Sequence, residues 1–313
     1  MALPIPLVGR LRLPVVAAPM FLVSGPELVI AACRAGVIGA FPALNRRSTE
    51  GLGEWLETIA GALTPADAPY AVNLIVHRTN ARLAADLEVV VAHRVPVVIT
   101  SLGAAAEVVD AIHSYGGVVF HDVTTAAHAR KAAGAGVDGL ILVAAGAGGH
   151  AGALSPFALM AEVRRTFAGT ILLAGAITSG SDVLAARAMG ADLAYLGTRF
   201  VATTESLASD DYRDQVVAAG AADIVHTASV STIPANFLRR SLELAGLDPA
   251  AVPGPVDLGH LTRPSRADAK AWRDIWSAGH GVAGIDDVLP VAELVDRLAQ
   301  EYDDARRRLF AEG

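Results

Sequence analysis

The chain has 313 residues, with 25 lysine and arginine residues against 32 aspartate and glutamate residues, and a formal net charge of -7. Hydrophobic residues make up 53% and charged residues 18%. This excludes a disordered chain, because there is enough apolar surface to offset the entropy of ordering. The acidic balance argues against a nucleic-acid binder, which needs a basic surface to displace phosphate counterions. The single cysteine, Cys33, cannot form an internal disulfide, so no oxidising compartment is required.

Two uncharged runs resemble targeting or membrane segments. Residues 13–26 imitate a secretory signal, but Pro14 and Pro19 interrupt the run and favour a buried strand followed by a turn. Residues 139–161 are long enough to span a bilayer, but their glycines and a proline favour a strand, a loop and a helix. We therefore expect a cytoplasmic protein that interacts with no membrane and no nucleic acid.

Between Pro14 and Leu196, short apolar runs alternate with segments of helical periodicity. Each apolar run is continuous, as in a parallel strand that is covered on both faces. The predicted strands are 15–19, 37–41, 71–76, 97–100, 118–122, 139–144, 171–175 and 193–197, and predicted helices include 25–36, 81–94, 103–116 and 181–190.

Eight strands that alternate with helices predict an α/β fold of the (β/α)₈ TIM-barrel type. A doubly wound open sheet is the alternative, although no G-x-G-x-x-G motif follows the first strand. Residues 1–202 and 286–313 are assigned to the barrel, with a closing amphipathic helix near the C-terminus. Residues 203–285 show no strand pattern, so we expect a mostly helical extension that covers the active-site side of the barrel mouth.

The most informative candidate site is the glycine-rich segment GAGGHAG at 146–152, which follows the sixth predicted strand. Glycines permit positive φ angles and a close approach of the backbone to a ligand. His150 in this segment would lie at the barrel mouth, where an imidazole is suited to take or give a proton at neutral pH. A flexible loop with an incidental histidine is the alternative.

Two further loops follow the seventh and eighth predicted strands, the positions where barrels commonly bind phosphate. They are GAITSG at 175–180 and GTRF at 197–200, and the hydroxyls of Thr178, Ser179 and Thr198 are candidate donors. Ordinary helix capping explains glycine with serine or threonine equally well for one loop, but two loops at these positions favour a phosphate site.

Polar residues also occur within otherwise apolar strands. Asn73 must find hydrogen-bond partners or a ligand if its amide points into the barrel. His121 and Asp122 are adjacent in a strand, so their side chains point to opposite faces and cannot both face the site. Motifs such as H-E-x-x-H and C-x-x-C do not occur, and we expect no metal site.

Taken together, these motifs resemble the nitronate monooxygenases, formerly called 2-nitropropane dioxygenases, which are FMN-containing (β/α)₈ enzymes. The resemblance runs through almost the entire chain. The matching segments are PVVAAPM (14–20), GVIGAFPALN (36–45), AVNL (71–74), AGAGGHAG (145–152), LLAGAITSG (172–180), GADLAYLGTRF (190–200) and WSAGHGVAGIDDVLP (276–290).

The resemblance implies FMN as the cofactor, His150 as the catalytic base, and the oxidation of alkyl nitronates by O₂ to a carbonyl compound and nitrite. The substrate is then a small nitronate or nitroalkane, and homodimer formation is left open. The implied cofactor-binding residues are Ala18, Pro19, Met20, Asn73, Gly148, Gly149, Gly175, Ala176, Tyr195, Leu196, Gly197 and Thr198.

The sequence also departs from the family pattern. Many members carry a glutamine at the end of the sixth strand and a glutamate before Gly-Gly-His, where this chain has Val143 and Gly146, and Tyr195 replaces a glutamine in the eighth strand. One alternative is an FMN-dependent, NAD(P)H-using reductase of enoyl-acyl-carrier-protein or acyl-CoA compounds, with extension arginines such as Arg239 and Arg263 near a phosphorylated carrier. A non-redox phosphate-binding lyase or isomerase that uses His150 as base is the other.

Overall fold

The computed structural model describes residues 3–103, 105–230, 233–248 and 274–311. Within these residues, eight parallel strands form a closed barrel in chain order, with the eighth strand hydrogen-bonded to the first. The predicted TIM barrel is therefore confirmed. The strands are β1 (Val15–Ala17), β2 (Ile38–Pro42), β3 (Ala71–Ile75), β4 (Val97–Ser101), β5 (Val118–Val123), β6 (Gly139–Val143), β8 (Thr170–Ala174) and β9 (Leu193–Leu196).

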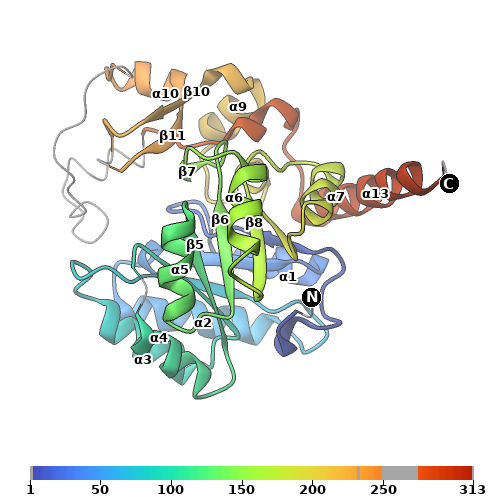
Figure 1. Ribbon diagram of the computed structural model, residues 1–313. Helices are drawn as coiled ribbons and strands as arrows, with labels where there is room; N and C mark the ends of the chain where they lie inside the picture. Colours follow the sequence, from blue (N-terminus) through green and yellow to red (C-terminus); the bar gives the residue numbers. More distant parts are fainter. Residues whose placement is uncertain (1–2, 104, 231–232, 249–273, 312–313) are drawn as a thin grey trace.

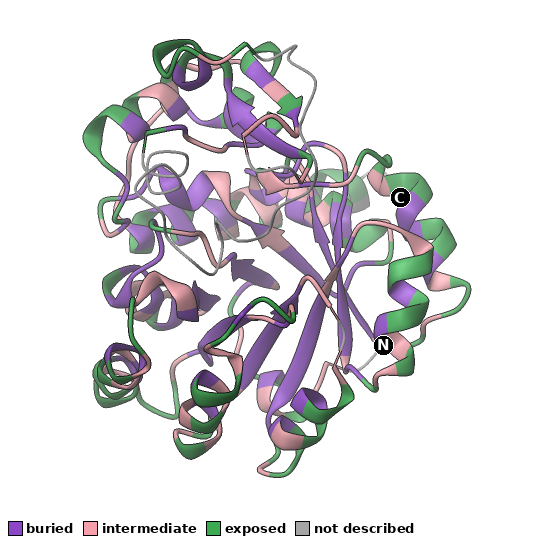
Figure 2. Cartoon of the chain, turned by 90° about the vertical axis from the view of Figure 1, so that its left-hand side faces the viewer, coloured by how far each residue is buried: buried purple, intermediate pink, exposed green. Residues whose placement is uncertain are grey.

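Helices lie outside this ring and cover its outer face (Figures 1 and 2). Strands are buried on both faces, which explains why the sequence shows continuous apolar runs in place of alternation. The helices that follow successive strands are α1 (Pro26–Ala35), α2 (Thr49–Ala62), α3 (Leu83–Ala92), α4 (Ala106–His113), α5 (Ala126–Gly134), α6 (Pro156–Arg164), α7 (Gly180–Ala188) and α8 (Thr198–Val201). The C-terminal helix α13 (Val291–Phe310) packs against α7 and α1.

The barrel interior holds a hydrophobic cluster that is separate from the larger layer between strands and helices. Ile99 and Phe120 belong to the interior cluster, and Leu7 from the short 3₁₀ helix η1 (Ile5–Leu7) packs into it. Successive residues of a strand point to opposite faces, so residues two positions apart share a face. Ser101 lies two residues after Ile99, and Asp122 lies two residues after Phe120. Both side chains therefore also face the barrel interior, near the C-terminal ends of their strands.

The described part of residues 203–285 forms a cap at the C-terminal end of the barrel (Figure 1). We expected a mostly helical extension with no strand pattern; the described part also contains two strands, β10 (Ile224–Thr227) and β11 (Ala235–Leu238), which pair with β7 (Gly149–His150) in a three-stranded antiparallel sheet. These strands are short and carry polar residues, so they lack an apolar run. The other described cap elements are α9 (Asp210–Ala218), η3 (Ala221–Asp223), α10 (Arg239–Leu244) and η4 (His280–Gly284). Residues 249–273, which include Arg263, lie outside the described residues.

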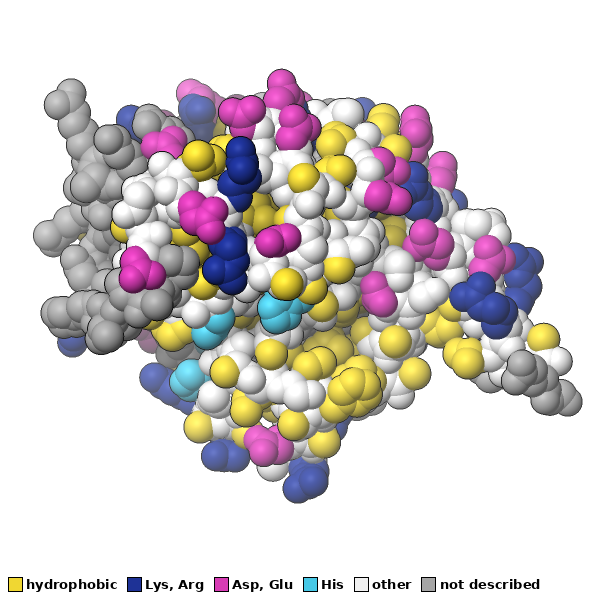
Figure 3. Space-filling view, turned by 90° about the horizontal axis from the view of Figure 1, so that it is seen from above, with side chains coloured by type: hydrophobic (Ala, Val, Ile, Leu, Met, Phe, Trp, Pro, Cys, Tyr) yellow, Lys and Arg dark blue, Asp and Glu magenta, His cyan; other side chains and the backbone are white. Residues whose placement is uncertain are grey.

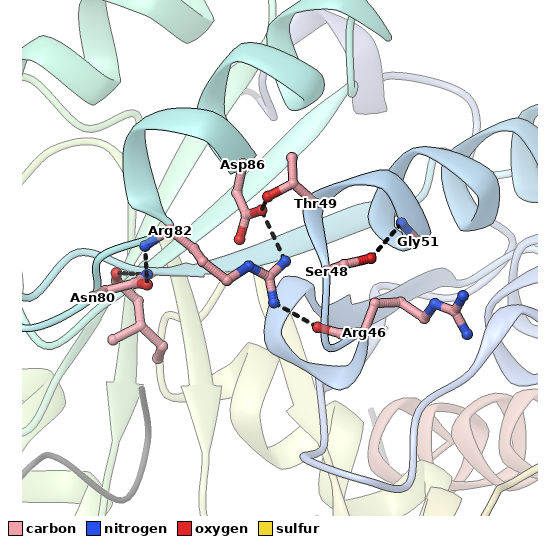
Figure 4. Close-up of polar contacts among 8 residues, drawn as sticks. Arg46, Ser48, Thr49, Gly51, Asn80, Arg82 and Asp86 are labelled. Carbon is pink, nitrogen blue, oxygen red and sulfur yellow. Dashed lines mark hydrogen bonds and ion pairs between the residues drawn. The ribbon is translucent and has the colours of Figure 1, made fainter. Parts of the chain in front are cut away.

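A buried polar network joins the loops after β2 and β3 at the edge of the barrel mouth (Figure 4). The Arg82 guanidinium donates to the Arg46 carbonyl at 2.6 Å and to Asp86 Oδ1 at 2.8 Å. Thr49 Oγ1 donates to the same Asp86 oxygen at 2.7 Å, and the Arg82 backbone N–H donates to Asn80 Oδ1 at 3.1 Å. Asp86 is only 1% exposed, so these bonds stabilise a carboxylate that would be costly to bury alone.

Candidate active site

A cavity of about 840 Å³ lies where the C-terminal ends of the barrel strands meet the cap. Its size is within the range of small-molecule and cofactor sites. His150 and all the implied cofactor-binding residues except Leu196 line this cavity, namely Ala18, Pro19, Met20, Asn73, Gly148, Gly149, Gly175, Ala176, Tyr195, Gly197 and Thr198. Of the candidate hydroxyl donors, Thr178 also lines the cavity and Ser179 does not. Leu196 is 1% exposed and packs into the outer hydrophobic layer. Its backbone carbonyl accepts a hydrogen bond from the N–H of Ala18, which does line the cavity.

The glycine-rich segment holds His150 on the cavity wall. Gly149 has a φ of +68°, a conformation that glycine adopts without a steric penalty. Gly149 and His150 form the short strand β7, whose residues pair with Asn236 and Ala235 of β11. The predicted loop position of His150 is thus replaced by a strand that the cap holds in register.

The cap fixes this segment through a side chain that the sequence interpretation missed. Asn236 is 2% exposed, and its Nδ2 donates to the Ala147 carbonyl at 2.6 Å. Its Oδ1 lies 2.9 Å from Nδ1 of His226. Since the amide oxygen can only accept, Nδ1 of His226 is the protonated nitrogen. His226 also lines the cavity, so two imidazoles reach it from one sheet. In the view onto the cap, histidine side chains gather beside hydrophobic ones (Figure 3).

The loops after β8 and β9 form a second corner of the cavity, next to the glycine-rich segment. Thr198 Oγ1 accepts from the Gly279 N–H at 2.9 Å. A Cβ added at Gly148 would lie 3.0 Å from both of these atoms. The backbones of Gly148 and Gly279 and the Thr198 hydroxyl therefore meet here at distances that leave little room for a further side chain. Ala176, in the loop after β8, has a φ of +54°, which is an uncommon conformation for a residue with a Cβ.

The helix-capping explanation holds for part of the loop after β8. The backbone N–H groups of Thr178 and Ser179 donate to Asp182 Oδ2 at 3.0 and 2.9 Å, and Ser179 Oγ accepts from the Asp182 N–H. The Gly180 N–H donates to Glu301 of α13 at 2.7 Å. The start of α7 is therefore occupied by the protein's own carboxylates. An anion in this corner would use donors nearer Ala176 and Thr198.

Asn73 finds the partners that its position within an apolar strand requires. Its Nδ2 donates to Ser101 Oγ at 2.7 Å and to the Ile99 carbonyl at 3.2 Å. Ser101 Oγ in turn donates to Asp122 Oδ2 at 2.5 Å. The three side chains come from successive strands, and each lines the cavity.

The expectation that His121 and Asp122 cannot both face the site was wrong, because both residues line the cavity even though neighbouring strand positions point to opposite faces. Nδ1 of His121 lies 2.7 Å from Thr100 Oγ1. Burial lowers the pKa of His121 to about 4, with a smaller contribution from the charges of His128 and Lys131. Burial raises the pKa of Asp122 to about 6, and the Ser101 hydrogen bond only partly opposes this.

The remaining wall of the cavity is mostly apolar. Val143 and Ala174 lie on the inner face of β6 and β8, and Met20 lines the wall after β1. Tyr195 packs against the interior cluster, and its pKa is raised well above 10 by burial and by the nearby charge of Asp122. Val143 and Tyr195 are two of the departures from the family pattern, so this floor offers fewer polar side chains.

These features fit a phosphorylated flavin. A flat ring system packs well between apolar walls, and the phosphate of a flavin requires donors such as the backbone N–H groups that glycines leave uncovered. The cavity wall is mostly apolar, and the exposed backbone of Gly148 lies in it beside the tightly packed corner at Thr198. Among the described residues, no cluster of three or more histidine, cysteine, aspartate or glutamate side chains is suited to hold a metal ion. The described helices include none that is both long and apolar enough to cross a membrane.

The fold and the cavity define a TIM-barrel enzyme whose site lies at the C-terminal ends of the strands. The chain matches the nitronate monooxygenase family over residues 8–301 and belongs to that family. It is therefore an oxidoreductase of the FMN-dependent kind that this family comprises.

Relatives with different activities resemble the chain to similar degrees. It is 31% identical to a (3aS,4S,5R,7aS)-5-hydroxy-7a-methyl-1-oxo-octahydro-1H-indene-4-carboxyl-CoA dehydrogenase of Mycobacterium tuberculosis, over 73% of this chain and 64% of the relative. The matched region thus spans less than two thirds of that relative's length. A nitronate monooxygenase of Paraburkholderia phytofirmans is 27% identical, over 97% of this chain and 96% of the relative.

Solved structures with the same fold include members of more than one group. The nitroalkane oxidase of Streptomyces ansochromogenes is 28% identical, with a TM-score of 0.81 over 97% of this chain and 99% of that protein. A single-residue variant of FabK from Thermotoga maritima is 25% identical, with a TM-score of 0.80 over 97% of both chains.

Proposed function

We propose that the protein oxidises alkyl nitronates with O₂ in an FMN-dependent reaction that yields a carbonyl compound and nitrite. The observation that carries this proposal is the placement of His150 on a cavity wall built from glycine backbone, in a chain of the nitronate monooxygenase family. In the net reaction, two nitronates and one O₂ give two carbonyl compounds and two nitrite ions, so each nitronate gains one oxygen atom at carbon.

The proposed role of His150 is to take the acidic α-proton from a neutral nitroalkane, which gives the nitronate anion. An imidazole is suited to this step because its ordinary pKa lies near neutral pH. The hydrogen bonds of β7 and β11 fix the backbone of His150, so little reorganisation is needed when substrate binds. The apolar wall at Val143 and Met20 would contact the alkyl part of the substrate.

The residues that would hold FMN lie in two groups. The loops at Gly175–Ala176 and Gly197–Thr198 would bind its phosphate through backbone donors and the Thr198 hydroxyl, and the ring system would lie near Met20, Asn73 and Gly148. Bound FMN supplies an electron acceptor for the nitronate. The cap would exclude bulk water above the site, because residues such as Tyr212 and Pro234 close that side of the cavity.

A second candidate function is supported by the relatives. One is named a carboxyl-CoA dehydrogenase and another is FabK, and the CoA group in the first name supports redox chemistry on a thioester-linked substrate. In this case the enzyme would use NADH or NADPH to reduce the flavin before the double bond of the substrate is reduced. The two candidates differ in the compound that delivers electrons to the flavin.

Anaerobic flavin reduction tests both candidates. The purified protein is reconstituted with FMN and mixed without oxygen, first with NADH or NADPH and then with ethyl nitronate, while the visible flavin absorbance is recorded. Bleaching by the nitronate alone supports the proposed function, and rapid bleaching by a nicotinamide alone supports the reductase. A protein that binds FMN but bleaches with neither contradicts both, and a protein that binds no FMN contradicts any flavin-dependent function.

A further inference from the structure

Three polar side chains form a directed hydrogen-bond chain on the inner face of the barrel. Asn73 donates to Ser101 at 2.7 Å, and Ser101 donates to Asp122 Oδ2 at 2.5 Å. Ser101 thus uses its only proton toward the carboxyl group and accepts from the amide. Both donors point toward Asp122, so the carboxyl group is the accepting end of the chain.

The other carboxyl oxygen of Asp122 has no such partner. Oδ1 has almost no solvent-accessible surface and forms no hydrogen bond with any residue that the structure describes. A buried acceptor without a donor is costly, and more so when it carries charge. Burial raises the pKa of Asp122 to about 6, which leaves the group mostly ionised at neutral pH. The site therefore requires a hydrogen-bond donor that these side chains do not provide.

The direction from which this donor comes follows from the surrounding residues. Asp122 lines the cavity on the inner face of β5, and its register partner on β6 is Ile141, whose side chain has no polar atom. Tyr195 is close enough for the Asp122 charge to raise its pKa, yet among the described residues no hydrogen bond reaches Asp122 Oδ1. A molecule that fills the cavity above the barrel floor is then the available source of a donor.

We propose that Asp122 is a cofactor-contacting residue whose Oδ1 accepts a hydrogen bond from the imide N–H of the flavin ring, with Ser101 and Asn73 as positioning residues. This inference rests on the FMN-dependent function proposed above. The oxidised flavin ring carries one N–H group and otherwise presents acceptors. Nitronate anions and O₂ have no N–H or O–H group to offer, so the substrates do not meet the requirement.

The ionised carboxylate has a second consequence for the cofactor. Reduction adds electron density to the flavin ring, and a fixed negative charge beside the ring disfavours that change. Replacement of Asp122 by asparagine removes the charge but keeps a carbonyl acceptor of the same shape. Alanine removes both. The two variants therefore separate the contribution of the hydrogen bond from that of the charge.

The test measures FMN affinity and midpoint potential in wild type, Asp122→Asn, Asp122→Ala and Ser101→Ala. We expect Asp122→Ala to bind FMN at least tenfold more weakly and Asp122→Asn to bind within a few-fold of wild type. The midpoint potential of Asp122→Asn is expected to rise by about 30 mV, which equals a tenfold change in the relative affinity for two-electron-reduced flavin. Asp303→Asn, on the exposed side of α13, is the matched control and should change neither quantity.

A flavin analogue addresses the N–H group itself. We expect N3-methyl FMN to bind wild type at least tenfold more weakly than FMN, and this difference to shrink in Asp122→Ala, because the two changes remove the same interaction. Circular dichroism and thermal unfolding check that each variant is folded. If all variants bind FMN and the methylated analogue with the same preference as wild type, the inference is overturned while the proposed function stands. If wild type binds no FMN, both are overturned.

Discussion

Asn236 of the cap and Ala147 of the barrel are joined by a hydrogen bond of 2.6 Å across 89 residues of sequence. The bond runs from a buried side chain to the backbone of the segment that carries His150. It makes the cap part of the site, because the position of the histidine depends on a residue in a different region of the chain. The backbone pairing of Ala235 with His150 adds to this connection.

Replacement of Asn236 tests this connection. Asn236→Ala removes the donor, and Asn236→Asp keeps an acceptor for His226 but places a carboxylate oxygen against the Ala147 carbonyl. Because a displacement of about 1 Å can cost on the order of 100-fold in rate, we expect kcat/KM for a nitroalkane to fall at least tenfold in both variants. Steady-state oxygen consumption measures the effect. Wild-type kinetics in Asn236→Asp would show that the Ala147 bond does not position the site.

His150→Asn should separate proton removal from the later steps. The variant cannot accept the α-proton at neutral pH, so turnover of a neutral nitroalkane is expected to fall by roughly 100-fold or more. Turnover of a preformed nitronate, which has already lost that proton, should be affected much less, and FMN should remain bound. Oxygen uptake with both substrate forms checks this prediction. Equal losses on the two forms would rule out the assigned role of His150.

Gly279→Ala should disturb the corner where three segments meet. An added Cβ would lie 2.3 Å from the Gly146 carbonyl oxygen and 2.7 Å from the Gly148 nitrogen, and both are backbone atoms that cannot rotate away. We expect a loss of about 1–3 kcal/mol in the free energy of unfolding and weaker FMN binding. Gly61→Ala is the control, because a Cβ there meets nothing within 4 Å in α2. It should stabilise the protein by about 0.5–1 kcal/mol. Urea unfolding and flavin titration report both effects, and equal behaviour of the two variants would contradict the steric explanation.

His121 and Asp122 should impose opposite pH dependences on stability. The folded pKa of His121, about 4, lies below its unfolded value near 6.5, so its contribution is present above pH 6.5 and is lost as the pH falls toward 4. The folded pKa of Asp122, about 6, lies above its unfolded value near 3.9, so its contribution is present below pH 3.9 and is lost as the pH rises through 6.

The two effects partly cancel in wild type between pH 4 and 6, and single variants should expose each of them. Relative to wild type, His121→Gln should lose stability as the pH rises across this window, whereas Asp122→Asn should gain it. The change in the free energy of unfolding relative to wild type should be roughly 2–3 kcal/mol at most for each variant. Chemical unfolding of the FMN-free protein at pH 4.5 and pH 7 measures both slopes. Parallel curves for the three proteins would be incompatible with the pKa shifts of these residues.

The barrel strands were predictable because each is buried on both faces. Predicted and observed limits differ by one residue for most strands, as for 37–41 against Ile38–Pro42. Strong local signals also placed the loops after the strands, and hence the residues that line the cavity. These signals require no knowledge of distant contacts.

The cap sheet was not predictable in the same way. β7 has two residues, one of them Gly149, and it exists as a strand because β11 lies beside it. The polar residues His226 and Asn236 interrupt the apolar pattern of the other two strands, yet their hydrogen bond makes those positions favourable. Similarly, Asp122 gains its importance from Ser101, which lies 21 residues earlier in the chain. Contacts of this kind carry no local sequence signal.

The seam between the ends of the chain has a consequence for biosynthesis. Arg12, just before β1, forms an ion pair of 2.5 Å with Asp296 of α13. In addition, one of the two strands that pair with β1 is β9, which is made much later. On the ribosome, the first strand therefore keeps one edge unpaired until residues near 196 have emerged, and the side of α1 that packs against α13 stays exposed until α13 follows. The nascent chain therefore exposes an unpaired, aggregation-prone strand edge for most of its synthesis. The yield of folded protein in a cell should depend on chaperones that bind the incomplete barrel.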